Sequence, residues 1–276
     1  IKTGKNVEML RLNCNLSSSH PELNENNYNG FITTPVESYW PNGYGLYNMA
    51  GNVNEWLAET GKSKGGSWSL PPYNARLDVP GYYDGNTAAR PDIGFRYLIE
   101  VVSVKNNFTP VKMDKTYFKK QFVALPDSIK SKRIWACKTE VSNAEYQTFF
   151  YVVKDSTYAI KLSNWSAYFK YGYYQMYGVN SGFNNYPVVN ITYEAVLAYC
   201  DWLTQKYNNT KGRTYQKVKF KLPNNSEWEL AALGGHKDFH FPWGGPYLRN
   251  SVGCYLANYA PLEDRFIYRK NSVTKY

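Results

Sequence analysis

The sequence predicts an irregular α+β fold that is rich in loops, with short strands and a few helices. Helix-capping signals occur in the second part of the 276-residue chain, and turn-forming Gly, Pro and Asn pairs interrupt the first part every few residues. Capping signals mark the ends of helices, and frequent turns leave room only for short strands. Aromatic residues make up 17% of the composition, with 27 tyrosines and 8 tryptophans, which is ample material for a core.

Three helices are predicted in the second part from their N-cap residues. Ser142 and Asn224 are each followed three residues later by a glutamate, which is the spacing of a capping box, and glycines at 234–235 end the second of these helices. Thr192 caps a third helix between them. The apolar positions at helical spacing are Tyr146, Phe149, Phe150 and Val153 after Ser142, and Val196, Cys200, Leu203 and Tyr207 after Thr192.

The first part contains turns and short strands. Residues 95–102 form a run of aromatic and β-branched residues, which predicts a strand. Residues 103–120 contain Asn106, Asn107 and Pro110 and are predicted to be a linker between the two parts. The turn pairs are Asn29-Gly30, Asn42-Gly43, Gly65-Gly66, Pro71-Pro72 and Pro80-Gly81.

Charge and hydropathy exclude several classes of function. The formal net charge is +10, but the basic residues are scattered in short clusters and no nucleic-acid-binding motif accompanies them, so no nucleic-acid partner is predicted. No stretch approaches the roughly 18 apolar residues of a membrane helix. No signal peptide opens the chain, and the first residue is Ile1 rather than Met, which suggests a mature product or a fragment.

The four cysteines are widely spaced and form no CxxC pair, which argues against a zinc site. They are Cys14, Cys137, Cys200 and Cys254. Cys200 is expected to be a small buried thiol on its helix face. A disulfide in an exported protein remains open, because connectivity cannot be read from the sequence.

One long motif resembles the signature of the formylglycine-generating-enzyme (FGE-sulfatase) family. Residues 41–56 read Pro-Asn-Gly-Tyr-Gly-Leu-Tyr-Asn-Met-Ala-Gly-Asn-Val-Asn-Glu-Trp, followed in family order by Gly-Gly-Ser-Trp at 65–68, Ala-Arg at 89–90 and Gly-Phe-Arg at 94–96. Elements of the N-terminal half of such a domain come later, at residues 138–146, 186–190, 222–229 and 241–244. The resemblance implies an irregular α+β fold related to C-type lectins.

The order of these elements predicts two half-domains. Residues 1–102 resemble the C-terminal half of one domain, and residues 121–276 resemble the N-terminal half of a second, joined by the linker at 103–120. A circular permutation and a piece of a tandem array both produce this order. Asn15-Leu16 and Asn258-Tyr259 match the same family position about one domain length apart, and a permuted single domain would contain that stretch once. A tandem array with incomplete ends is therefore favoured.

The resemblance implies two structural calcium sites. One would take the side chains of Asn15 and Asn29 with the carbonyls of Leu16 and Phe31, and the other the side chains of Asn48 and Glu55 with the carbonyls of Gly51 and Val53. Carboxylate, amide and backbone oxygens suit Ca²⁺. The family commonly has Asp where Asn29 stands, so the first site is expected to be the weaker one.

Catalysis is not expected. The family's enzymes hold copper with two cysteine thiolates between the Gly-Gly-Ser-Trp and Gly-Phe-Arg elements, and residues 69–94 contain no cysteine. Leu70, Tyr73 and Ala75 stand nearest to those positions and cannot replace a thiolate. A related iron branch uses three histidines, but His236 and His240 are placed in a loop by the preceding glycines and by Pro242. Neither copper nor iron is therefore expected.

The resemblance favours a non-catalytic scaffold. Residues 121–276 most resemble the gliding-motility and type IX secretion lipoproteins of Bacteroidota, the GldK/PorK and GldJ group, which implies protein partners in a cell-envelope complex. It also implies an exported protein, periplasmic or associated with the outer membrane, whose lipid anchor, if any, would precede Ile1.

Two alternatives stay open. One is a copper- or iron-dependent oxidase whose ligands lie outside this chain. The other is a C-type-lectin-like ligand-binding protein, because tyrosine and asparagine are adaptable contact residues. The residues of that possible ligand surface are Tyr73, Asn74, Arg76, Tyr82, Tyr83, Asp84 and Asn86.

Overall fold

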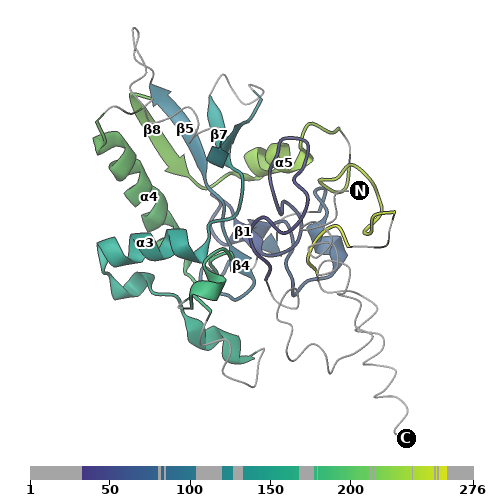
Figure 1. Ribbon diagram of the computed structural model, residues 1–276, viewed down its shortest axis with the longest axis horizontal. Coiled ribbons are helices and arrows are strands. Elements are labelled where there is room, and N and C mark those ends of the chain that lie inside the picture. The colour runs from purple at the N-terminus through teal and green to yellow at the C-terminus, as the bar shows by residue number, and fades with distance from the viewer. Residues whose placement is uncertain are drawn as a thin grey trace, which may run out of the picture.

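The structure is a computed structural model that describes residues 33–79, 82–83, 85–103, 120–126, 133–167, 177–178, 180–211, 213, 215–237, 239–251, 253 and 255–259. It is a mixed α+β fold with short strands, as predicted (Figure 1). The strands are β1 Asn54–Trp56, β2 Lys62–Lys64, β3 Tyr82–Tyr83, β4 Ile93–Gly94, β5 Leu98–Ser103, β6 Phe122–Ala124, β7 Ile134–Cys137 and β8 Lys217–Lys221. The α-helices are α3 Asn143–Val153, α4 Tyr193–Asn209 and α5 Asn225–Leu233, and the 3₁₀ helices are η2 Pro72–Ala75, η3 Ser156–Tyr158, η4 Leu162–Ala167 and η6 Ser181–Phe183.

The three predicted helices are confirmed, together with their caps. The side chains of Ser142 and Asn224 accept from the N–H groups of Glu145 and Glu227, and each glutamate side chain accepts from the backbone of its cap residue. Thr192 caps α4 in the predicted way. Because each capping box satisfies two N–H groups that a helix end otherwise leaves unpaired, these short helices begin where the sequence places them.

Two four-stranded sheets form the framework. One sheet has the strand order β3-β2-β1-β4, and the second has the order β6-β7-β5-β8. In the second sheet, β5 is antiparallel to both β7 and β8. Figure 1 shows α4 beside β8 and α5 on the other side of this sheet, near β7.

Strand alternation on β5 divides the core into two layers. Ile99, 0% exposed, packs in a cluster with the apolar face of α4, whereas its neighbour Leu98 packs in another cluster with Trp228 and Ala232 of α5. Successive side chains of a strand point to opposite faces, so one strand serves both layers.

The predicted strand at 95–102 is shifted toward its C-terminal end, because β5 begins at Leu98. Residues 95–97 still bond to the backbone, since Phe95 O accepts from Val141 N and Tyr97 O from Cys137 N. The buried Arg96 side chain reaches to Glu55. The pattern of apolar residues at 95–102 does not indicate this buried contact of Arg96 with Glu55, so the prediction starts the strand too early.

The predicted linker lies mostly outside the described residues, and the tandem arrangement stays a prediction. Within the described part of the chain, elements from both sides of the linker share one sheet and one core. Among the described residues, no helix is long and apolar enough to cross a membrane.

Candidate functional site

The four residues predicted to form the second calcium site lie in the loop before β1, which holds Asn48, Gly51 and Val53, and in β1 itself, which holds Glu55. Asn48, Gly51 and Asn52 have positive φ angles of 50°, 75° and 64°. This left-handed conformation is uncommon for residues other than glycine, and asparagine tolerates it best. A Cβ on Gly51 would lie 2.4 Å from the carbonyl oxygen of Asn258, so glycine is required there for space as well as for conformation. The loop is therefore tightly constrained.

Asn48 has an unsatisfied buried oxygen. Its Nδ2 donates to Val36 O at 3.2 Å and to Glu140 Oε2 at 3.1 Å, whereas its Oδ1 accepts no hydrogen bond. Leaving a polar atom buried without a partner costs about 1–3 kcal/mol, so native proteins rarely do so. Among the described residues, no backbone N–H donates to the carbonyl of Gly51 or of Val53. Amide and backbone carbonyl oxygens are the kind of ligand that a hard cation such as Ca²⁺ takes.

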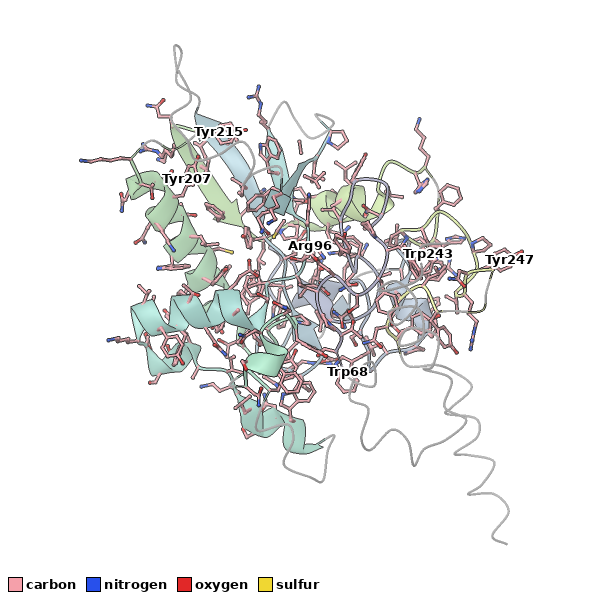
Figure 2. All side chains as sticks on the ribbon, viewed as in Figure 1. Trp68, Arg96, Tyr207, Tyr215, Trp243 and Tyr247 are labelled. Atoms are coloured by element: carbon pink, nitrogen blue, oxygen red, sulfur yellow. The ribbon has the colours of Figure 1, made fainter. Side chains whose placement is uncertain are left out.

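Glu55 is the fourth predicted ligand, and its carboxylate is already paired. Arg96 Nη2 donates to Glu55 Oε1 at 2.8 Å, and Trp228 Nε1 donates to Oε2 at 2.9 Å. The side chains of Arg96 and Glu55 are 0% and 1% exposed. Figure 2 shows Arg96 near the centre of the molecule. A cation bound here would find a carboxylate whose charge Arg96 already compensates, so its affinity would depend mainly on the neutral oxygens.

Glu140 is a member of this site that the sequence analysis did not single out as functional. Its Oε1 accepts from Asn52 Nδ2 at 2.9 Å, and its Oε2 accepts from Asn48 Nδ2. It is 0% exposed, and burial raises the pKa of its carboxyl group to about 8. A glutamate shortly before a capping box carries no local sign of burial, because the asparagines that hold it lie far away in the sequence.

The other predicted calcium site cannot be placed. Asn15, Leu16, Asn29 and Phe31 all lie outside the described residues. Both calcium assignments therefore stay predictions, with the unsatisfied Asn48 Oδ1 as the structural feature that favours the second.

Residues 69–94, where the resemblance implies the copper-binding cysteines of an enzyme, contain no cysteine. Ala75 is 0% exposed, and a Cβ on Gly66 would lie 2.8 Å from Ala75 N, so the backbone is closely packed at this point. The two described cysteines, Cys137 and Cys200, are free and buried in the core cluster around α4. Burial raises the pKa of Cys137 to about 11 and that of Cys200 as well, so both remain thiols at neutral pH.

His236 and His240 lie in a loop, as predicted. His236 and Phe239 make an edge-to-face contact, and His240 Nδ1 lies 3.1 Å from Asp78 Oδ2 and 3.2 Å from Arg76 Nη2. Within the part of the chain that the structure describes, no three His, Cys, Asp or Glu side chains converge as a metal site.

The structure describes part of the possible ligand surface. Tyr73 is 60% exposed, and the guanidinium of Arg76 lies 5.7 Å from its ring centroid. Asn86 is exposed and accepts from Ala88 N in a turn. Tyr82 and Tyr83 belong to β3, whose backbone pairs with β2, and Asp84 lies outside the described residues.

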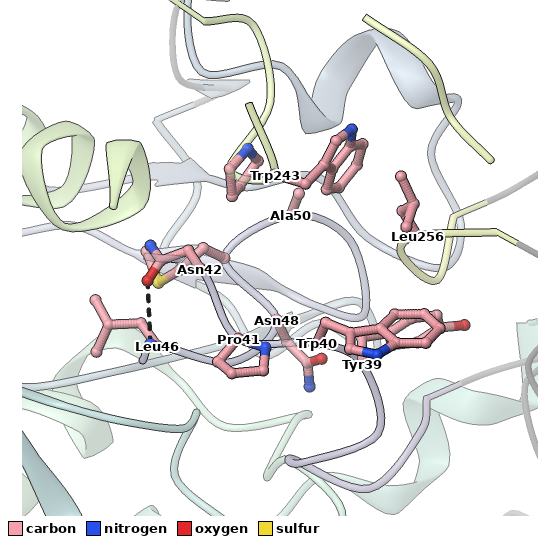
Figure 3. A pocket seen from close by; sticks show the side chains of 11 residues that line it. Tyr39, Trp40, Pro41, Asn42, Leu46, Asn48, Ala50, Trp243 and Leu256 are labelled. Carbon is pink, nitrogen blue, oxygen red and sulfur yellow. Dashed lines mark hydrogen bonds between the residues drawn. The ribbon is translucent and has the colours of Figure 1, made fainter. Parts of the chain in front are cut away.

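A small pocket of about 40 Å³ opens between the loop at 39–50 and the segment at 242–256. Figure 3 shows Pro41, Trp40 and Tyr39 along one side and Trp243 and Leu256 along the other. Trp40 is 50% exposed, and no charged side chain lines the pocket. Sequence reasoning did not identify it, because its two walls are far apart in the chain.

Comparison with known proteins covers almost the whole chain. The model of the sulfatase-modifying factor enzyme 1-like (FGE-sulfatase) domain matches residues 6–101 and 110–276. The chain is similar to the formylglycine-generating enzyme of Streptomyces coelicolor, 38% identical over 90 residues, covering 32% of this chain and 26% of the relative. It is 55% identical to the enzyme of the same name from Thermomonospora curvata over 38 residues, or 14% of this chain and 12% of the relative.

A third relative is named as inactive. The inactive C-alpha-formylglycine-generating enzyme 2 of Bos taurus is 30% identical over 74 residues, covering 27% of this chain and 20% of the relative. The matched segments thus span about a quarter or less of these curated relatives. No solved structure matches the chain significantly.

Proposed function

The chain belongs to the FGE-sulfatase family, and on that premise we propose that it is a non-catalytic, calcium-stabilised interaction module of a bacterial cell-envelope assembly. The family contains proteins named as formylglycine-generating enzymes and others named as inactive, so membership alone leaves activity open. The choice between an active and an inactive protein therefore depends on the residues of this chain.

The observation that carries the proposal is the replacement of the copper ligands. Residues 69–94 contain no cysteine, and Ala75, one of the residues nearest to a ligand position, is fully buried against Gly66. Cu(I) requires soft ligands such as thiolates, which leucine, tyrosine and alanine do not supply. The two described cysteines are protonated thiols in the core around α4 and offer no substitute.

Calcium is proposed as a structural ion at the loop before β1. Asn48 Oδ1 and the carbonyls of Gly51 and Val53 would hold it, and Glu55 would contribute a carboxylate oxygen. A bound ion would fix a loop whose left-handed residues are otherwise strained. The first calcium site, formed by Asn15, Leu16, Asn29 and Phe31, remains part of the proposal by resemblance.

An envelope scaffold is the role that the resemblance of residues 121–276 to gliding-motility and type IX secretion lipoproteins supports. Its partners would be other proteins of such a complex, on the periplasmic side of the outer membrane. The fold would be the irregular one related to C-type lectins. A lipid anchor, if there is one, would lie outside this chain.

Ligand binding of the C-type-lectin type is the second candidate. The exposure of Tyr73 and its contact with Arg76 favour it, because an exposed aromatic ring beside a guanidinium is a good contact surface. Substituting both with alanine would abolish ligand capture if this surface were the binding site, and would leave a scaffold role unchanged.

Metal content is the decisive measurement. Untagged protein would be analysed for bound elements, and its thermal midpoint measured with and without EGTA. A cysteine-containing substrate peptide would be assayed for aldehyde formation in parallel. Near-stoichiometric calcium, a midpoint that falls in EGTA and no aldehyde would support the proposal. Bound copper with aldehyde formation would overturn the non-catalytic assignment. The absence of calcium would overturn the assignment of a stabilising calcium ion.

A further inference from the structure

By their resemblance, the two segments of this chain correspond to complementary halves of one family domain. Residues 33–103 contain the elements that close such a domain, and residues 120–259 contain the elements that open it. Each half therefore presents a surface that, in the usual order, the other half would cover. In this structure the two surfaces cover each other.

Strand β5 is the first part of this interface. It belongs to the first segment, yet its neighbours on both sides, β7 and β8, belong to the second. Ile99 faces Trp135 on one side and Phe220 on the other, and it is 0% exposed. A strand without these neighbours would leave its backbone donors and acceptors unpaired on both edges.

Buried polar contacts form the second part. Trp228 on α5 donates to Glu55, and Arg96 donates to the carbonyl of Cys137 at 2.9 Å. Glu140 accepts from Asn52. All of these side chains are at most 2% exposed, so separating the segments would remove a set of buried polar contacts that join them.

Close backbone approaches form the third part. A Cβ on Gly43 would lie 2.2 Å from the carbonyl oxygen of Gly234, and Gly51 packs just as closely against Asn258. Asn42 Nδ2 also donates to Ala231 O at 2.7 Å, at the C-terminal end of α5. Contacts this close require two surfaces shaped for each other.

We propose that the face that residues 33–103 turn toward residues 120–259 is a docking surface for an N-terminal-type half-domain, and that the second segment of the same chain is its partner. Pairing of the two segments within one chain is the arrangement of a permuted domain, the alternative to the tandem array that the repeated stretch at Asn15-Leu16 and Asn258-Tyr259 favours. The covalent connection through residues 104–119 serves to keep them close and is not needed to hold them together.

The test cuts that connection in the folded full-length protein. A specific protease site is introduced within residues 104–119, the purified chain is cleaved, and the product is examined by gel filtration and thermal melting. The two fragments are expected to elute together as one species and to separate only in denaturant. After cleavage the thermal midpoint is expected to depend on protein concentration, because association has become bimolecular, whereas the uncut protein shows no such dependence.

Two substitutions sharpen the result in the cut protein. Ile99→Glu places a charge in the interface on β5 and is expected to release the fragments at micromolar concentration. Tyr151→Glu alters a 70%-exposed residue of α3 and is expected to leave them associated. Separation of the unsubstituted fragments in native buffer would overturn the proposal. The proposal would also be overturned if the fragments still eluted together with Ile99→Glu just as they do with Tyr151→Glu. The fragments would then be held by something other than this interface.

Neither calcium nor a binding partner enters this measurement. Its failure would therefore leave the proposed envelope role untouched, and the loss of that role would not affect the docking of the two segments.

Discussion

Arg96 and Glu55 form an ion pair that is closed to solvent, with Arg96 Nη2 2.8 Å from Glu55 Oε1 and side chains 0% and 1% exposed. The guanidinium also donates to the carbonyls of Cys137 and Tyr47, so one side chain joins β1, β7 and the loop before β1. Each charge of the pair is compensated by the other, and removing one partner would leave the other as an uncompensated buried charge.

Arg96→Leu is therefore expected to lower the free energy of unfolding by about 3–5 kcal/mol, because it leaves the Glu55 carboxylate buried without a counter-charge. Urea denaturation would measure the loss. The matched control is Arg76→Leu, which removes an exposed partner of Asp78 and should change little. A double substitution, Arg96→Met with Glu55→Leu, should lose less than Arg96→Leu alone. Equal losses for Arg96→Leu and Arg76→Leu would contradict this account.

Glu140 predicts a pH dependence of stability. Burial raises the pKa of its carboxyl group from 4.5 to about 8. Because the folded protein holds this proton more tightly than the unfolded chain does, the contribution is fully present below about pH 4.5 and is lost as the pH rises through about 8. The slope can reach about 1.4 kcal/mol per pH unit.

Glu140→Gln is expected to flatten that slope, since glutamine does not titrate and still accepts through its amide oxygen. Urea midpoints measured across this pH range, in buffer without calcium, would show it. Glu194→Gln, at an exposed position in the first turn of α4, serves as the control and should keep the slope of the parent protein. A slope unchanged by Glu140→Gln would assign the pH dependence to other groups.

Asn48 predicts where calcium acts. Asn48→Gly keeps the left-handed backbone accessible and removes the unsatisfied Oδ1. The thermal shift between calcium and EGTA is expected to shrink markedly in this variant, because ligand-linked stability falls as the dissociation constant rises. Asn190→Gly is the matched control, since Asn190 is likewise buried and left-handed, at φ 59°, and its side-chain oxygen likewise accepts no hydrogen bond. It should keep the full shift, and equal shifts in the two variants would remove Asn48 from the site.

Gly51 predicts a steric effect that is separate from calcium. Gly51→Ala should destabilise the protein by more than about 2 kcal/mol, because its φ of 75° strains an L-residue and its Cβ would meet the Asn258 backbone at 2.4 Å. Gly245→Ala is the control, because nothing lies within 4 Å of the added Cβ there. Thermal melting of both variants compares them directly, and a loss at Gly51 no larger than at Gly245 would show that the loop can adjust.

Local sequence signals predict the helices, whereas strand pairing and the surroundings of the candidate site depend on contacts between residues far apart in the chain. Ser142, Thr192 and Asn224 carry their capping information within four residues, so their helices could be placed from sequence alone. Residues 217–221 are one of the short basic clusters of the sequence, and their lysines alternate with Val218 and Phe220 on strand β8. The strand that pairs with β8 is β5, which lies far away in the sequence.

The candidate site also depends on contacts that the local sequence does not reveal. The motif at 41–56 identified Asn48 and Glu55, but their surroundings depend on Arg96, Glu140 and Trp228, which come from three other segments. Nothing in the local sequence indicates that Glu55 is paired with an arginine or that Asn48 leaves an oxygen unsatisfied. The pocket beside Trp40 is likewise a product of tertiary contact.

The position of β5 has a consequence for biosynthesis. A ribosome delivers β5 before either β7 or β8, so this central strand leaves the exit tunnel with both edges unpaired. Chains begin to fold while they are being made, and unpaired apolar strands promote aggregation. Completion of the sheet must wait until Lys217–Lys221 has been translated. We expect a nascent chain stalled before that point to depend on chaperones, and a chain released after it to fold without them.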